Sequence, residues 1–372
     1  IDQMKRPAYD SPSLPITWDR WEYVEGQNEY VSIRPEVRKS IDDMYAEADS
    51  AAENGDPKLL ENLKQQFGDN PYELKNILKY WVRSDKEGLR VIPTDSLVMK
   101  IDKEAVRRSG MKIPDALGDS IPEYMTILLR DANGKPKRAL YKSELMMLEM
   151  LANANWERPF YMAITVGSEN QLGMENHFIQ EGLAYRFTPF DTNKLNSKID
   201  SEKMYDNLMN KFKFGGIDKP GIYIDENVMR MCYTHRRIFT QLVGQLIREG
   251  KKDKALAALD YAEKMIPSTN VPYDWANGSF QMAEAYYQLG KKEKADQIID
   301  ALANKSLEYM NWYLSLTDNQ LAIAGESFMY NAGLIDAEVR LMEKYKSEEL
   351  SKRYSPQLER LYSEYVTRMK GQ

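Results

Sequence analysis

The chain is poor in the residue types on which most metal and nucleophilic sites depend. It has one cysteine, Cys232, and two histidines, His177 and His235, among 372 residues. A single cysteine excludes an internal disulfide and leaves the redox compartment undecided. A zinc site needs His and Cys at close spacing, and a nucleophilic triad needs a histidine base. We therefore expect no metal, no cofactor and no catalytic residue in this chain.

Other signals of function are also absent. None of the 20 glycines forms a G-x-G-x-x-G or P-loop pattern, and no Asp-x-Asp triplet suggests a sugar-nucleotide cation site. The longest apolar run, 145–151, is interrupted by Glu149 and is far shorter than the roughly 18–20 residues of a membrane span. The 51 basic and 57 acidic residues give a net charge of −6, which argues against nucleic-acid binding.

The first residues indicate a piece of a longer protein. The chain starts at Ile1, and 1–15 lack the basic-then-apolar pattern of a signal peptide. Residues 1–33 have no period and read as an extended arm that packs over another part of the protein. Its packing residues would be Pro12, Pro15, Trp18, Trp21 and Tyr23.

The next part alternates between helical and strand patterns. We expect helices near 35–53, 57–67 and 71–83, and a helix over 143–153. Strand patterns occupy 96–101, 124–129, 159–166 and 183–187. Because a strand, a helix and a strand follow in order, we expect a right-handed crossover and parallel pairing.

From about 201 onward the pattern is helical and contains a repeat. Gly250-Lys251-Lys252-Asp253-Lys254-Ala255 recurs 40 residues later as Gly290-Lys291-Lys292-Glu293-Lys294-Ala295. Each copy lies between two amphipathic helices, which is typical of stacked helical hairpins of the tetratricopeptide kind. The small residues Ala255 and Ala262 would let two helices approach closely. A third, degenerate hairpin would turn at Gly333, and a polar helix over 355–369 would end the stack.

These patterns predict an α+β fold that is mostly α. A small mixed or parallel sheet unit is followed by a tetratricopeptide-like stack of helical hairpins. We expect an arm with helices over 1–89, a small α/β unit over 90–200 and a helical repeat domain over 201–372.

One helix of the repeat domain carries candidate binding residues. Arg230, Tyr233, Arg236 and Arg237 lie on the helix expected over 227–249. Stacked hairpins present such helices on a concave face that binds peptides or other chains. The alternative is that these long side chains only cover the helix surface.

Two segments resemble a known family. They are Asn155-Trp156-Glu157-Arg158-Pro159-Phe160-Tyr161 and Glu181-Gly182-Leu183-Ala184-Tyr185-Arg186, followed by Phe214-Gly215-Gly216, Tyr223, Asp225, Arg230-Met231 and Arg236. Together they resemble the C-terminal part of the domain-of-unknown-function 2723 family, which consists of multi-pass membrane proteins abundant in Bacteroidetes. These look like relatives of protein O-mannosyltransferases, including the vertebrate transmembrane protein 260. Family members carry membrane helices and a Gly-Asp-Asn-Asp motif upstream, and neither occurs in this sequence.

The resemblance implies a non-catalytic, extracytoplasmic (periplasmic) region of a membrane-bound, glycosyltransferase-like parent. Its partners would be the parent's membrane domain and an acceptor protein or partner subunit on the repeat face. Trp156, Arg158, Tyr185 and Arg186 would shape the small unit or bind, although a structural role is the more common one: Trp156 and Tyr185 in the core and Arg158 in an ion pair. Two alternatives remain open: a soluble part that completes a mannosyl-transfer active site, and a stand-alone adaptor.

Overall fold

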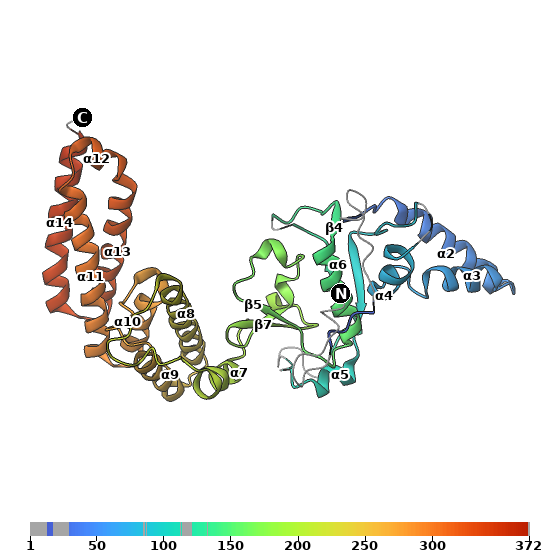
Figure 1. The fold of residues 1–372 in the computed structure, drawn as a ribbon, viewed down its shortest axis with the longest axis horizontal. Coiled ribbons are helices and arrows are strands. Elements are labelled where there is room, and N and C mark those ends of the chain that lie inside the picture. The colour runs from blue at the N-terminus through green and yellow to red at the C-terminus, as the bar shows by residue number, and fades with distance from the viewer. Residues whose placement is uncertain are drawn as a thin grey trace. The chain divides into compact units, whose positions relative to one another are not determined.

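The computed structural model describes residues 13–17, 30–84, 86, 88–111, 113, 121–131 and 133–370. The chain forms two compact units, Ile1–Asp200 and Ser201–Gln372 (Figure 1). One hydrophobic core of the first unit contains side chains on both sides of residue 89, such as Ile41 and Leu145. The boundary that we expected at 89/90 therefore does not separate two cores. Of the expected arm, Pro12, Trp18, Trp21 and Tyr23 lie outside the described residues.

The first unit combines helices with short antiparallel sheets. β2 (Ser96–Lys100) and β3 (Tyr124–Leu128) pair along their whole length. Leu97 and Met99 point into the core while their neighbours face outward, as the period of two requires. The helical elements are α2 (Val37–Glu53), α3 (Lys58–Phe67), α4 (Leu74–Asn76) with its π-helical continuation Ile77–Val82, α5 (Lys103–Arg108) and α6 (Lys142–Ala154).

The predicted parallel pairing is wrong. All pairs of named strands in the described residues are antiparallel. β1 (Tyr30–Ser32) pairs antiparallel with β4 (Ala139–Tyr141). The third sheet has the order β5-β7-β6, also antiparallel. α6 connects strands of different sheets, so the crossover rule, which concerns strands of one sheet, does not apply. The bounds of the third sheet are β5 Tyr161–Ala163, β6 Phe178–Gln180 and β7 Ala184–Phe187.

The second unit is a stack of helical hairpins, so the predicted α+β fold with a predominance of helix is confirmed. α8 packs on α9 and α10 on α11. Gly250 and Gly290, both at φ 75°, make the turns within these hairpins. The helices are α7 (Ser201–Asp206), continued by a π-helix over Asn207–Lys211, α8 (Glu226–Arg248), α9 (Lys252–Met265), α10 (Ser279–Gln288), α11 (Lys292–Leu314), α12 (Asp318–Ile323), α13 (Gly325–Lys344) and α14 (Glu348–Lys370).

Small residues permit the close packing within these hairpins. Ala255, Ala262 and Ala295 are all buried at helix contacts. In the last part of the unit, α11 and α13 lie side by side and α14 packs on both (Figure 1). None of the described helices is both long enough and apolar enough to cross a bilayer.

The third hairpin turns at a different place from the one predicted. Gly333 lies inside the continuous helix α13, and the turn follows at Lys346, which has φ 58°. A glycine inside a helix costs only about 1 kcal/mol relative to alanine, and the buried residues around Gly333 continue the packing against α11. Glycine alone was therefore a poor marker of this turn.

Glu338 lies on the buried face of α13 with both carboxylate oxygens lacking a hydrogen bond to any described residue. Burial raises the pKa of this carboxyl from 4.5 to about 8. The folded chain therefore keeps a proton that the unfolded chain loses above pH 4.5. The contribution of the protonated Glu338 to the free energy of unfolding is complete below about pH 4.5 and is lost as the pH rises towards 8.

Replacement Glu338→Gln should flatten this pH dependence because glutamine does not titrate. The free energy of unfolding of the wild-type chain should fall on the order of 4 kcal/mol between pH 4.5 and pH 8. Urea unfolding across this range measures it. The matched control is Glu343→Gln, on the exposed face of the same helix. Its free energy of unfolding should fall with pH as that of the wild-type chain does. If the free energy of unfolding of Glu338→Gln falls with pH as steeply as in the wild-type chain, Glu338 does not cause the pH dependence.

Candidate functional site

The first unit contains the cluster on which the family resemblance rests. α6 ends in two successive left-handed residues, Asn155 at φ 47° and Trp156 at φ 61°. A bulky side chain in this conformation is an outlier that the surrounding packing must hold. The Trp156 ring stacks on Phe187 of β7, with centroids 5.5 Å apart and planes 10° apart. Its Nε1 donates to the carbonyl of Lys100 at 3.3 Å.

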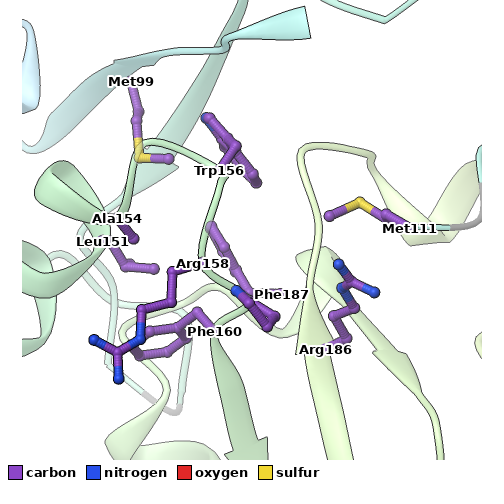
Figure 2. A pocket seen from close by; sticks show the side chains of 10 residues that line it. Met99, Met111, Leu151, Ala154, Trp156, Arg158, Phe160, Arg186 and Phe187 are labelled. Atoms are coloured by element: carbon purple, nitrogen blue, oxygen red, sulfur yellow. The ribbon is translucent and has the colours of Figure 1, made fainter. Parts of the chain in front are cut away.

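A small cavity lies beside this stack. Figure 2 shows Trp156 and Phe187 in its centre, with Arg158 on one side of Phe187 and Arg186 on the other. The cavity volume is about 20 Å³, which is room for a single water molecule. Small-molecule pockets occupy roughly 300–1,000 Å³. In this conformation the cavity has no room for a sugar or a nucleotide.

Arg158 contacts the segment at the beginning of the described chain. Its guanidinium donates to the carbonyl of Ser13 at 2.5 Å. Four residues later, Thr17 donates through its backbone N–H to Glu149 at 3.0 Å, and Arg83 pairs with the same carboxylate at 3.0 Å. The segment 13–17 is thus held at both ends, and Arg158 acts there as a packing residue.

Arg186 lies at the bottom of the site in a buried polar network. Its side chain is 4% exposed and lies 3.6 Å from the Glu181 carboxylate. It also donates to the carbonyl of Ser109 at 2.8 Å. Glu181 accepts a hydrogen bond from the Tyr161 hydroxyl at 2.7 Å. Burial, together with this bond, raises the pKa of Tyr161 to about 12, so the phenol stays protonated.

Tyr185 does not line the cavity. It is half-buried on β7, where it pairs with Met162 and Gln180. Successive residues of a strand face opposite sides, so Tyr185 and Arg186 point away from each other. The structure thus brings Trp156, Arg158 and Arg186 together and separates Tyr185 from them.

The four candidate residues of the second unit lie on α8, which is preceded by its N-cap residue Asp225. The Asp225 carboxylate accepts the backbone N–H of Asn227 and Val228 at 2.8 and 2.9 Å, a favoured N-cap arrangement. Arg230 is exposed and pairs with Glu226, and Arg237 is exposed. Tyr233 is half-buried.

Arg236 corrects our expectation of a surface residue. It is 1% exposed, and its guanidinium donates to the carbonyls of Val271 at 2.7 Å, Pro272 at 2.9 Å and Ile266 at 3.3 Å. These carbonyls belong to the segment that connects the first two hairpins. Arg236 is therefore a structural residue and does not face a partner.

The second unit contains a larger pocket that no sequence motif indicates. Its volume is about 150 Å³, and it lies between Asp274–Ala276, α11 and α13. The available signal was the spacing of Leu302, Lys305, Ser306 and Tyr309 on one face of α11. Among the residues that the structure describes, no cluster of His, Cys, Asp and Glu could hold a metal ion.

Replacement Arg186→Met should destabilise the first unit on the order of 3 kcal/mol, because Glu181 would lose its buried cation. Thermal and urea unfolding measure this change. Arg138→Met, at an exposed position of the same unit, should stay within about 0.5 kcal/mol. Equal unfolding curves for the two variants would show that the Arg186 network does not contribute to the stability of the first unit.

Similarity to known proteins identifies the family of this chain. No curated protein and no solved structure matches the chain. The family model described as TMEM260-associated domain 2 matches residues 1–204, which include the Trp156–Phe187 stack and the Arg186 network. The predicted relationship to transmembrane protein 260 is thereby confirmed, and the match covers more than half of the chain. The chain belongs to the TMEM260-associated domain 2 family.

Proposed function

We propose that this chain is a non-catalytic, extracytoplasmic region of a membrane-bound, glycosyltransferase-like protein. The first unit packs near the parent's membrane domain, and the second unit binds an acceptor protein or partner subunit. The family match supports the choice of parent, because transmembrane protein 260 resembles protein O-mannosyltransferases. The alternative is that this chain contributes residues to a mannosyl-transfer site. The cavity beside Trp156 and Phe187 does not favour it, because that cavity has room for only one water molecule.

One observation carries the binding role. Within ten residues, 222–231, four large apolar side chains are exposed: Ile222, Tyr223, Val228 and Met231. Tyr223 is 91% exposed. Single exposed apolar residues are ordinary, but a local group of them marks an interaction site. We call these four residues, with Arg230 and Arg237, the α8 patch.

The chemistry of the α8 patch favours a protein partner. Met231 is a flexible, polarisable side chain of a kind common on binding surfaces. Arg230 and Arg237 lie seven residues apart, which places them on one face of α8. At about 100° per residue, Val228 lies on the opposite side of α8 from these arginines, so the patch wraps around the N-terminal part of the helix, where 226–228, 230 and 231 are all exposed. This arrangement suits a partner segment that combines acidic and apolar side chains, with the charges contributing specificity and association rate.

Site-specific cross-linking in the full-length protein tests this role. A photo-reactive amino acid at Met231 should capture a discrete protein, and the same group at Tyr362, an exposed position on α14, should not. The captured protein, once purified, should bind the chain saturably. Arg230→Glu with Arg237→Glu should weaken this binding at least about tenfold through like-charge repulsion.

The matched control is Arg360→Glu on α14, another exposed arginine, which should leave binding unchanged. The proposal fails if Met231 and Tyr362 yield the same adducts. It also fails if reversing both charges of the α8 patch has no larger effect than Arg360→Glu.

A further inference from the structure

The pocket of the second unit has the size of a six-membered ring. It lies between Asp274–Ala276, α11 and α13 and has a volume of about 150 Å³. An engineered apolar cavity of roughly this volume in another protein admits benzene. Here, however, four of the ten lining residues are polar: Asp274, Lys305, Ser306 and Asn331. A ring that fills this pocket must itself carry polar groups.

Ser306 provides the first polar group for a ligand in this pocket. Ser306 is 4% exposed and lines the pocket. A hydroxyl can both donate and accept, so Ser306 can bond to either kind of polar group on a ligand. The Nε1 of Trp275 is buried, so Trp275 contributes its ring and not its N–H group to the pocket.

Asn331 adds a second polar group, which has spare hydrogen-bonding capacity. It is 8% exposed, and its amide donates one hydrogen bond, to the carbonyl of Ser327 at 2.9 Å. An asparagine side chain can donate two and accept two hydrogen bonds. Within the described residues the amide oxygen of Asn331 accepts none, and its side chain lines the pocket.

Aromatic rings complete the pocket. Tyr309 and Tyr330 are 46% and 55% exposed, and they approach from α11 and α13. The Trp275 ring is held against Phe280, with centroids 5.0 Å apart. The face of an aromatic ring is electron-rich and attracts weakly positive C–H groups, such as those on one side of a sugar ring.

A charged pair contributes the last polar contacts. Lys305 lies 3.3 Å from the Asp274 carboxylate, and both side chains remain partly exposed. Asp274 also accepts a hydrogen bond from Asn277 at 2.7 Å. An ammonium group and a carboxylate side by side can donate to and accept from neighbouring hydroxyls of one ligand.

We infer that this pocket binds a single neutral hexopyranose, either free or as the terminal residue of a glycan. The ring would fill the volume, its C–H face would contact the tyrosines, and its hydroxyls would bond to Ser306 and Asn331. A phenol side chain from a partner protein has one hydroxyl and would leave most of these groups unpaired, at a cost in affinity. This site is independent of the α8 patch.

Ligand-observed NMR on the whole chain tests the inference. The probes are the methyl glycosides of glucose, galactose, mannose and N-acetylglucosamine, with p-cresol and N-acetyltyrosinamide as rings without a sugar's hydroxyls. At least one glycoside should bind saturably with a Kd of about 1 mM, the scale for a dozen heavy atoms at a modest ligand efficiency. An oligosaccharide that ends in the same sugar should bind more tightly than the free glycoside if the natural ligand is a glycan.

Variants locate the binding in this pocket. Tyr330→Ala and Ser306→Ala should each weaken the glycoside about fivefold or more, on the scale of one lost contact. Tyr362→Ala and Ser363→Ala, at exposed positions on α14, should not change it. Tyr330 is half exposed, so its removal leaves the core of the unit in place, and the amide spectrum of each variant verifies folding.

Three results would overturn the inference. In the first, no glycoside shows saturable binding. In the second, p-cresol or N-acetyltyrosinamide binds more tightly than every glycoside, which would make the pocket an acceptor of a protein side chain. In the third, the α14 control variants lose binding as much as Tyr330→Ala and Ser306→Ala do.

Discussion

The buried guanidinium of Arg236 is the interaction on which the second unit depends most. It lies in the core, has no carboxylate partner among the described residues, and is held by three backbone carbonyls between Ile266 and Pro272. The rings of Tyr233 and Tyr273 lie 5.8 and 5.5 Å from it. Burial lowers the pKa of the guanidinium, but arginine remains charged in proteins. Each bond from a charged donor contributes about 1.5–3 kcal/mol.

These bonds determine the course of the connection between the first two hairpins. The connecting segment continues from Pro272 into Asp274 and Trp275, which form one side of the ring-sized pocket. Its end is fixed by Gly278, which has φ 93°. A Cβ atom there would lie 3.1 Å from the Cα of Arg237, so only glycine permits this close approach to α8. Two neighbouring residues of α8 thus position the pocket wall.

Much of this architecture could be predicted because it depends on local patterns. The apolar period of 3.6 located α8 and α11, and Gly250 and Gly290 located the hairpin turns, since a left-handed turn residue is a local requirement. The alternation over 96–101 located β2. The tetratricopeptide assignment and the periplasmic location remain predictions.

What could not be predicted depends on distant partners. Arg236 looks like a surface residue because its acceptors are backbone carbonyls 30–36 residues away, which sequence composition does not reveal. Parallel pairing failed because the strands on either side of α6 belong to different sheets. The pocket joins Trp275, Ser306 and Asn331 from three elements, and none of these residues belongs to a recognisable motif.

Hydrogen exchange of the Arg236→Met variant tests the central role of this residue most directly. The matched variant is Arg237→Met, its exposed neighbour on the same helix. We predict that Arg236→Met makes the amides of 270–279 exchange at least about tenfold faster, the effect of losing 1.4 kcal/mol or more, while α13 and α14 keep their protection. Equal exchange of 270–279 in the two variants would contradict the account.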